Sequence, residues 1–528
     1  MRSNCVPRLR FGLLSLHFGL LGGAKSEAIE CGIQQSLNNR QQRNHPVTVE
    51  ILRGDIHLID LRTRIPFKYG IATMTAPPHA FVRMFVRVDG REHVGIAADH
   101  LPPKWFTKDP DRGLDDEIDE MLLVVEHAVE IAAGLRGESA FDLWQQLYAA
   151  QSEWGERHGY PALLQNFGTS LVERAVIEAV CKAARLPFAT MVRQNRLGIR
   201  LGDFEDTLAG FDPADLLPPE PLRRTIARHT VGMADYLTPQ GIPDDERVDD
   251  GLPQALSECI ARYGLKHFKL KVLCDPAADV ERLERLLHVI EEGTRGNYAV
   301  SIDGNELCRS VEHFRDYWDA LRQTVSLRPL LDRLLCVEQP FHRDIALDCD
   351  VLADLRSWSD RPPLIIDESD SSIESLPTAL ELGYCGTSHK NCKGVFSGVA
   401  HACLLEACRR ENPRGNYVMT GEDLVNVGPV ALLQDMAVAA TLGVTSLERN
   451  GHHFLAGLSA HSNEVQQQVL AAHGDVYAAS RDGWPSMTIE GGTISLASTV
   501  DAPFGVGFKL DVEQFIPSEQ WKRNRAQQ

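Results

Sequence analysis

The chain has 528 residues, which is enough for two or three domains of ordinary size. Its 54 basic and 73 acidic side chains leave a formal net charge of −19. This balance argues against a general nucleic-acid-binding protein, because neutralising phosphates requires clustered lysine and arginine. The excess of acidic residues also favours solubility.

The first 46 residues differ in character from the rest. Arg8 and Arg10 precede an apolar stretch at 11–21, a pattern that resembles a secretory signal peptide. The alternative is an extension outside the folded protein, because residues 25–46 are polar and rich in Gln and Asn. The apolar stretch is shorter than the roughly 20 residues of a membrane-spanning helix, and no other segment is long enough. We therefore expect no membrane span and exclude residues 1–46 from the fold.

Cysteine usage bears on the compartment. The chain has 12 cysteines, and some of them, such as Cys336 and Cys385, lie inside apolar runs. Free cysteine behaves as a small buried hydrophobe, so we interpret these residues as core thiols in a reducing compartment. A cytoplasmic protein is the expectation, and an exported protein is the alternative if residues 1–24 are a true signal peptide.

Residues 47–195 predict an α+β domain, because a sheet is followed by helices. Residues 56–61 and 81–88 are rich in β-branched and aromatic residues. The second run alternates apolar residues with Arg and ends at Asp89-Gly90, which is typical of a strand before a tight turn. Apolar residues then recur at the spacing of an amphipathic helix. The expected helical stretches are 115–133, 141–150 and 169–186.

From about residue 228, short apolar runs alternate with helical stretches, which indicates a parallel sheet. We expect eight strands and seven intervening helices, and eight such strands close into a barrel. The predicted fold class is α/β, a (β/α)7β barrel of the TIM type at 196–484 next to the α+β domain. Residues 485–528 break the alternation, and we expect them to return to the N-terminal domain. The expected strands are 228–237, 267–272, 299–304, 334–339, 363–368, 384–390, 416–422 and 444–449, and the clearest helices are 277–293, 311–323, 396–410 and 429–443.

Five of these apolar runs end in a charged residue, in the order lysine, acid, acid, acid, lysine. They follow one another at intervals of roughly 23–35 residues, about the length of one strand, one helix and two loops in such a barrel. Each therefore lies at the C-terminal tip of a successive strand, the face where barrel enzymes have their active sites. The five residues are Lys271, Asp303, Glu338, Asp367 and Lys390.

Three carboxylates from neighbouring strands suit Mg²⁺, which prefers oxygen ligands and keeps waters that a substrate can displace. Asp303, Glu338 and Asp367 are the candidate ligands, although a single acid at a strand end is more often a helix cap or an ion-pair partner. Glu368 follows Asp367 directly, and neighbours in a strand point to opposite faces. We therefore expect only one of the two to face the barrel axis and the other to orient a lysine.

Lysines flank the acids. Lys269 and Lys271 are two residues apart in one strand and face the same side, and Lys390 comes four strands later, across the barrel. A nearby positive charge and a metal ion each lower the pKa of a lysine, which then accepts a proton near neutral pH. Lys271 and Lys390 are therefore predicted to flank a bound substrate as bases. The alternative is a lysine whose amine reaches solvent at a strand end.

These residues together resemble the enolase superfamily, specifically its muconate-lactonising-enzyme-like subgroup, which includes mandelate racemase. The resemblance covers roughly residues 50–515. The segments that carry it, in order, are Lys269-Leu270-Lys271, Asp303-Gly304-Asn305, Val337-Glu338-Gln339-Pro340, Asp367-Glu368-Ser369 and Lys390.

The resemblance implies an α+β capping domain over a (β/α)7β barrel. It also implies a Mg²⁺-stabilised enediolate, formed by removing the proton α to a carboxylate of a small substrate. Mn²⁺ is an alternative ion, and a symmetric homo-oligomer is expected. Racemisation or epimerisation, cycloisomerisation and dehydration remain open as outcomes. The matching residues are Asp303, Glu338 and Asp367 as metal ligands, Lys271 and Lys390 as the acid/base pair, and Lys269 as electrostatic support for the carboxylate.

The chain also departs from the family pattern. After Lys390 the family usually carries a glycine pair, where this chain has Lys393-Gly394-Val395-Phe396. Loops near 72–78 and 99–105 are expected to set the substrate. His452 and His453, after the eighth strand, are either substrate contacts or polar loop residues. The further candidates for ligand support or substrate contact are Asn305, Glu368, Glu422 and Glu448.

Two other classes of function remain open. One is a barrel aldolase whose lysine forms a Schiff base with the substrate, although that chemistry leaves the three carboxylates unexplained. The other is a barrel without catalytic activity that serves as a binding or scaffold protein.

Overall fold

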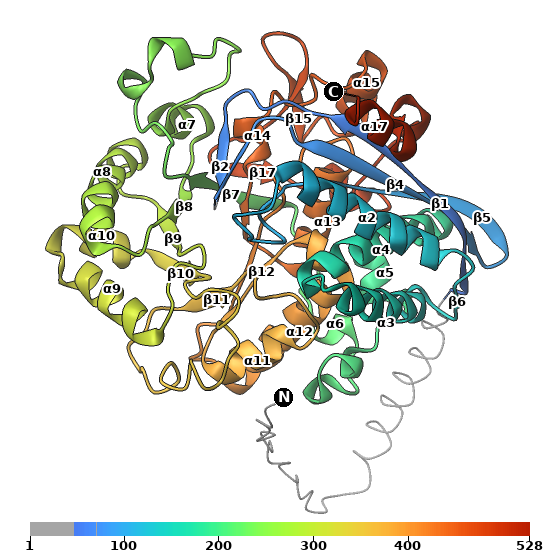
Figure 1. Ribbon diagram of the computed structural model, residues 1–528, viewed down its shortest axis with the longest axis horizontal. Helices are drawn as coiled ribbons and strands as arrows, with labels where there is room; N and C mark the ends of the chain where they lie inside the picture. Colours follow the sequence, from blue (N-terminus) through green and yellow to red (C-terminus); the bar gives the residue numbers. More distant parts are fainter. Residues whose placement is uncertain (1–46, 70, 528) are drawn as a thin grey trace, which may run out of the picture. The chain divides into compact units, whose positions relative to one another are not determined.

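The computed structural model describes residues 47–69 and 71–527 (Figure 1). The extension or signal-like segment predicted at 1–46 lies outside the described residues. Among the helices that are described, none combines the length and the apolar character needed to cross a membrane.

An antiparallel sheet begins the described chain. Two of its strands are joined at Asp89-Gly90, where both residues have positive φ, 48° and 80°. A turn of this kind matches the right-handed twist of the strands, and Asp-Gly is a favoured sequence for it. The sheet has the order β18-β1-β4-β5, with β6 on β1. Its strands are β1 (Val49–Asp60), β4 (Pro78–Val88), β5 (Arg91–His100), β6 (Arg136–Gly137) and β18 (Ile516–Pro517), and a separate hairpin is formed by β2 (Phe67–Tyr69) and β3 (Ala72–Met74).

Helices pack against this sheet, as Figure 1 shows, and the central helix connects it to the rest of the protein. In α4 the side chains from Leu163 to Cys181 are buried. Arg174 of α4 pairs with Asp99 of β5 at 2.8 Å, and Glu173 accepts a hydrogen bond of 2.7 Å from the backbone N–H of Phe396 in the barrel. These helices are α2 (Leu114–Ala132), α3 (Ala140–His158) and α4 (Ala162–Ala184), and α5 (Phe188–Arg193) follows, in contact with α4 and α13 (Ala431–Leu442).

Among the described residues, eight parallel strands form a closed barrel, because β14 pairs back to β7 through Leu447↔Ala227 and Glu448↔Arg228. The short apolar runs are buried on both faces, as parallel strands covered by helices should be. The predicted barrel with an α+β capping domain is confirmed. The strands are β7 (Arg224–Val231), β8 (His267–Lys271), β9 (Ala299–Asp303), β10 (Leu334–Glu338), β11 (Leu364–Ile366), β12 (Gly386–His389), β13 (Val418–Gly421) and β14 (Ser446–Glu448).

Within the described barrel, helices make six of the seven connections between strands, and turns replace the helix expected between β10 and β11. Residues 339–363, all of them described, contain turns where the helix between β10 and β11 was expected. The Asp348 carboxylate accepts hydrogen bonds from the backbone N–H groups of Asp350 and Val351, and such local bonds compete with a helix. The connecting helices are α7 (Leu256–Tyr263), α8 (Pro276–Thr294), α9 (Val311–Gln323), α10 (Arg328–Leu331), α11 (Ser375–Leu382), α12 (Val395–Glu411) and α13 (Ala431–Leu442).

The first barrel strand also differs from its prediction. The expected range of 228–237 is shifted, because β7 ends at Val231. The Asp235 carboxylate accepts a hydrogen bond of 2.6 Å from the backbone N–H of Gly232. This contact stabilises a turn at residues that the sequence pattern predicted to continue the strand.

The C-terminal segment contacts both parts of the protein. β17 pairs antiparallel with β7 of the barrel, whereas β18 pairs with β1. Phe515 stacks on Phe81 with ring centroids 4.3 Å apart. The predicted domain divisions at 195 and 484 stay predictions. The remaining strands are β15 (Tyr477–Ala479), β16 (Pro485–Met487) and β17 (Thr493–Ser495), and the remaining helices are α6 (Pro213–Leu216), α14 (Gly451–Phe454), α15 (Asn463–Ala472), α16 (Ala497–Asp501) and α17 (Ser518–Arg525).

Gly386, at the start of β12, provides a test of the barrel packing. A Cβ atom at this position would lie 1.7 Å from the carbonyl oxygen of Val418 on the paired strand, so Gly386→Ala must push the two strands apart. We expect the free energy of unfolding to fall by about 1–3 kcal/mol, measured by urea denaturation. Gly241→Ala is the control, because a Cβ there meets its nearest atom at 3.8 Å. Equal stability of the two variants would contradict the close approach of β12 and β13.

Candidate active site

The charged residues that the sequence placed at strand tips lie at the C-terminal ends of their strands. Lys271, Asp303 and Glu338 are the last residues of β8, β9 and β10. Asp367 and Lys390 directly follow β11 and β12. The five residues therefore share one rim of the barrel.

Lys269 connects four carboxylates inside this rim. Its side chain is 1% exposed, and its Nζ lies 2.8 Å from Glu338 Oε1 and 2.9 Å from Asp303 Oδ2. The same Nζ lies 2.9 Å from Glu448 Oε2 and 3.2 Å from Glu422 Oε1. Burial lowers the pKa of Lys269, but the four carboxylates outweigh it and hold this pKa well above the ordinary value. Lys269 is therefore a fixed positive charge at the centre of the site.

Lys271 lies beside Asp303 on the neighbouring strand. Its Nζ donates to Asp303 Oδ2 at 2.6 Å and to Asn305 Oδ1 at 3.1 Å. Asn305 in turn donates from Nδ2 to Asp303 Oδ1 at 2.7 Å. Asn305, predicted to support a ligand or contact substrate, thus orients both the acid and the lysine.

Lys390 is held by a second set of acids. Its Nζ lies 2.7 Å from both carboxylate oxygens of Asp367 and 2.8 Å from Glu422 Oε2. It also lies 4.7 Å from the centre of the Trp105 ring, within reach of a cation–π interaction. Glu422 therefore contacts both Lys269 on β8 and Lys390 after β12.

The lysine pKa values differ from the expectation of lowered values. Burial lowers the pKa of Lys271 and of Lys390. Asp303 beside Lys271 and Asp367 beside Lys390 raise these pKa values by more than burial lowers them, so both lie above normal. The sequence argument counted the neighbouring positive charge of Lys269, which does lower both values. It did not count Glu422 and Glu448, which the fold brings in from later strands. In the protein alone, both lysines are held as ammonium groups.

Carboxylate oxygens near Lys269 could hold a metal ion. Oxygen atoms of Glu338, Glu422 and Glu448 lie within 4.8 Å of one another, so this group shares only Glu338 with the predicted ligands. Glu338 Oε2 is buried without a hydrogen-bond partner. Burial and the nearby Glu422 raise the pKa of Glu338 well above its ordinary value. An unsatisfied oxygen among hard oxygen donors fits Mg²⁺. Asp303 is linked to this group through Lys269, and Asp367 is linked to it through Lys390.

Asp367 and Glu368 do not point to opposite sides, as the sequence argument expected of two neighbours in a strand. Both Asp367 and Glu368 line the same cavity, because β11 ends at Ile366 and the alternation of a strand does not extend to them. Glu368 Oε2 is buried without a hydrogen-bond partner. Burial, reinforced by Asp367, raises the pKa of Glu368 to about 7. This carboxyl is available to a ligand of the cavity.

A cavity opens above these residues. Its base is polar, and its far side is formed by the N-terminal domain, including the two loops that were expected to contact substrate. Lys271 and Lys390 both line it. The residues contributed by the N-terminal domain are Phe67, Tyr69, Met74, Pro102, Lys104, Trp105 and Lys108.

Some residues of the site were missed by the sequence argument. Lys393 Nζ lies 2.7 Å from Asp367 Oδ1 and donates to the Asp367 and Ser388 carbonyl oxygens. Lys393 stands where the family usually has a glycine pair, and this departure was the available signal. Nothing in the sequence indicated the direction of its amine. Gln339 Oε1 accepts from the backbone N–H groups of Asp367 and Ser369, and so fixes the loop after β11.

Comparison with protein-family models gave no match, and comparison with curated protein sequences gave none. Solved structures do match. A mandelate racemase/muconate lactonizing protein from Herpetosiphon aurantiacus is 15% identical with a TM-score of 0.52, over 87% of this chain and 98% of that one. An enolase from Streptomyces coelicolor is 16% identical with a TM-score of 0.54, over 91% and 98%. A dipeptide epimerase from Enterococcus faecalis, complexed with Mg and L-Leu-L-Tyr, is 14% identical with a TM-score of 0.52, over 87% and 100%.

These likenesses extend over most of the chain and nearly all of each matched structure. The chain has the fold of the mandelate racemase and muconate lactonizing proteins of the enolase superfamily. The resemblance drawn from the strand-tip residues is therefore confirmed at the level of the fold.

Lys269→Met tests the charge balance of the site. The variant leaves buried carboxylates without their shared cation, and we expect the free energy of unfolding to fall by about 3–5 kcal/mol. Such carboxyls have raised pKa values in the folded state, so the variant gains stability as the pH falls and they take up protons. Urea denaturation should therefore show a smaller loss at about pH 5 than at about pH 8.

Lys266→Met is the matched control, because Lys266 is exposed just before the same strand. We expect its stability to change by less than about 0.5 kcal/mol. A loss in Lys269→Met that is the same at both pH values would contradict the assigned charge balance.

Proposed function

We propose that this protein is an enzyme that removes the proton α to a carboxylate of a small substrate, in a Mg²⁺-dependent reaction. Racemisation or epimerisation, cycloisomerisation and dehydration all begin with this step. One observation carries the proposal. Lys271 and Lys390 come from strands on different sides of the barrel, line one cavity, and have a cluster of carboxylates beside them.

The two lysines have the roles of base and acid. A substrate with its α-carbon between them presents one face to Lys271 and the other to Lys390. One amine removes the proton, and the opposite ammonium returns a proton to the other face, which inverts the centre. Both side chains are oriented by acids, Lys271 by Asp303 at 2.6 Å and Lys390 by Asp367 at 2.7 Å, so their amines are positioned before substrate binds.

Mg²⁺ would be held by Asp303, Glu338 and Asp367, the ligands that the family resemblance implies, with Glu422 and Glu448 adjoining them. When bound, the ion supplies positive charge that offsets these carboxylates and favours the enediolate form of the substrate. Lysines less strongly held by Asp303 and Asp367 have lower pKa values and exchange protons more readily. Mn²⁺, which also accepts oxygen ligands, is the alternative ion.

The substrate class follows from the walls of the cavity. Phe67, Tyr69, Met74 and Trp105 give the cavity apolar lining beside its charged groups, and Trp105 lies 4.7 Å from Lys390. A ligand with a carboxylate at one end and an apolar substituent at the other matches this division. Acid sugars, N-acyl amino acids and dipeptides are the classes to screen, and we expect the last two to be preferred over the first.

Replacing either lysine tests the acid/base roles. In D₂O the wild-type protein should exchange the α-proton of its substrate for deuterium, which proton NMR measures. We expect Lys271→Ala and Lys390→Ala each to slow exchange by about 100-fold or more, with the fold retained by circular dichroism. Lys266→Ala, on the surface, should exchange at the wild-type rate. Undiminished exchange in both cavity variants would remove the two-base model.

Removing divalent ions tests the cofactor. We expect EDTA to abolish turnover and added Mg²⁺ or Mn²⁺ to restore it, because the oxygen ligands of the site suit both ions. Asp303→Asn should need a higher Mg²⁺ concentration for half-maximal activity. Full turnover by metal-free protein would count against the ligand assignment.

The alternatives from the sequence gain no support from the geometry. A Schiff-base lysine attacks a carbonyl group without help from a metal ion, so this chemistry leaves the carboxylates Asp303, Glu338 and Asp367 without a role. Trapping by borohydride in the presence of a keto acid would reveal an aldolase. A scaffold without activity does not account for a cavity whose base carries this many oriented charges.

A further inference from the structure

A second cluster of metal-ligand side chains lies outside the cavity, on the outer side of β7. Arg228 and Thr230 on β7 contact Glu448, inside the barrel. Because neighbouring side chains on a strand point to opposite faces, His229 points outward. There it meets Cys259 of α7, the first helix after β7, and His453 of α14, which follows β14. None of the three lines the cavity described above.

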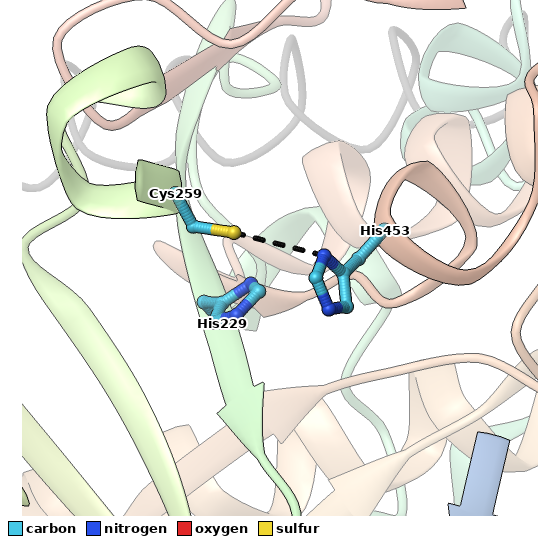
Figure 2. Close-up of side chains that lie close together, drawn as sticks. All are labelled: His229, Cys259 and His453. Carbon is cyan, nitrogen blue, oxygen red and sulfur yellow. Dashed lines mark hydrogen bonds between the residues drawn. The ribbon is translucent and has the colours of Figure 1, made fainter. Parts of the chain in front are cut away.

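The three side chains face one another (Figure 2). One ligand atom from each lies within 4.8 Å of the other two. Cys259 Sγ and His453 Nδ1 are 3.6 Å apart, and the ring centroids of His229 and His453 are 5.1 Å apart. Tetrahedral zinc with bonds of about 2.1 Å to nitrogen and 2.3 Å to sulfur places those two atoms about 3.6 Å apart. Cys259 Sγ and His453 Nδ1 therefore already have the separation expected of two ligand atoms bound to one tetrahedral zinc ion.

The cluster is also buried and incompletely hydrogen-bonded. His229 and His453 are each 3% exposed and Cys259 is fully buried. His229 Nδ1 has no hydrogen-bond partner, and neither nitrogen of the adjacent His452 has one. Buried polar atoms are normally paired, so these nitrogens are unexplained by the protein alone. Hydrogen bonding within the cluster accounts only for the Cys259 to His453 contact.

The chemistry of the donors selects the ion. Burial lowers the pKa of His229 to about 4 and that of His453 well below normal, so both rings are neutral, the form that binds metals. Burial raises the pKa of the Cys259 thiol, and a metal ion would have to displace its proton. Thiolate and imidazole suit Zn²⁺, whereas carboxylates suit Mg²⁺. Arg64 is a basic group near Cys259 and His453. Its charge is paired with Asp250 at 2.5 Å.

We propose that His229, Cys259 and His453 form a structural Zn²⁺ site, separate from the carboxylate centre in the barrel. Three protein ligands leave one tetrahedral position open; His452, whose ring lies 5.8 Å from that of His229, adjoins the site but is not part of the group of three. The site joins the first barrel strand, the first barrel helix and the short helix α14 after the last strand. That helix follows Glu448 and Asn450, which line the cavity, so the ion would hold this wall of the cavity in place.

The test uses the full chain, stripped of metal and titrated with Co²⁺ in the presence of excess Mg²⁺. We expect one Co²⁺ per chain with a thiolate-to-cobalt charge-transfer absorption, and displacement of Co²⁺ by one equivalent of Zn²⁺. Cys259→Ser should abolish this absorption and weaken Zn²⁺ binding at least tenfold. Cys181→Ser, a change at another fully buried cysteine in α4, should alter neither.

Measurements on the wild-type protein test the proposal even if Cys259→Ser fails to fold. X-ray absorption of the zinc-loaded wild type should show one sulfur and at least two nitrogen neighbours. Binding of less than one-tenth of an equivalent of Zn²⁺ would overturn the proposal. So would a cobalt spectrum without the thiolate band, or a zinc spectrum with oxygen ligands alone.

Discussion

The site depends on one buried ammonium group. Lys269 has an exposed fraction of 1% and lies within 3.2 Å of acids on β9, β10 and β14 and just after β13. A charge in such a place is costly unless it is closely paired. Its four partners are equally costly without it. Closure of the barrel therefore brings together the charges that neutralise its interior, and the remaining charges of the rim are arranged around this pairing.

The arrangement links the protonation of the lysines to the occupancy of the acids. Lys271 and Lys390 do not share a carboxylate, but Glu422 contacts both Lys269 and Lys390, and Asp303 contacts both Lys269 and Lys271. Any cation that engages these acids competes with the amines for the same oxygens. Lys393 adds a further contact to Asp367, with its Nζ 2.7 Å from Oδ1.

The sequence was sufficient for the barrel and for the positions of its strand-tip charges, because a charged residue after a short apolar run is a local signal. It was insufficient for the lysine pKa values. Asp303 and Asp367 raise these pKa values most, with Glu448 adding to the effect on Lys271 and Glu422 to that on Lys390, and the fold brings these acids from other strands beside the lysines. It also missed the turns that replace the helix after β10 and the end of β7 at Val231. In both places a side chain, Asp348 or Asp235, bonds to nearby backbone and overrides the periodic pattern.

The distribution of the four acids along the chain has a consequence for synthesis on the ribosome. Asp303 and Glu338 emerge soon after Lys269, but Glu422 follows later, and Glu448 comes only with the last barrel strand. A nascent chain that stops short of β14 holds its interior ammonium with an incomplete set of counter-charges. A partly made barrel is thereby disfavoured against the finished one, and premature closure around too few strands is discouraged by charge alone.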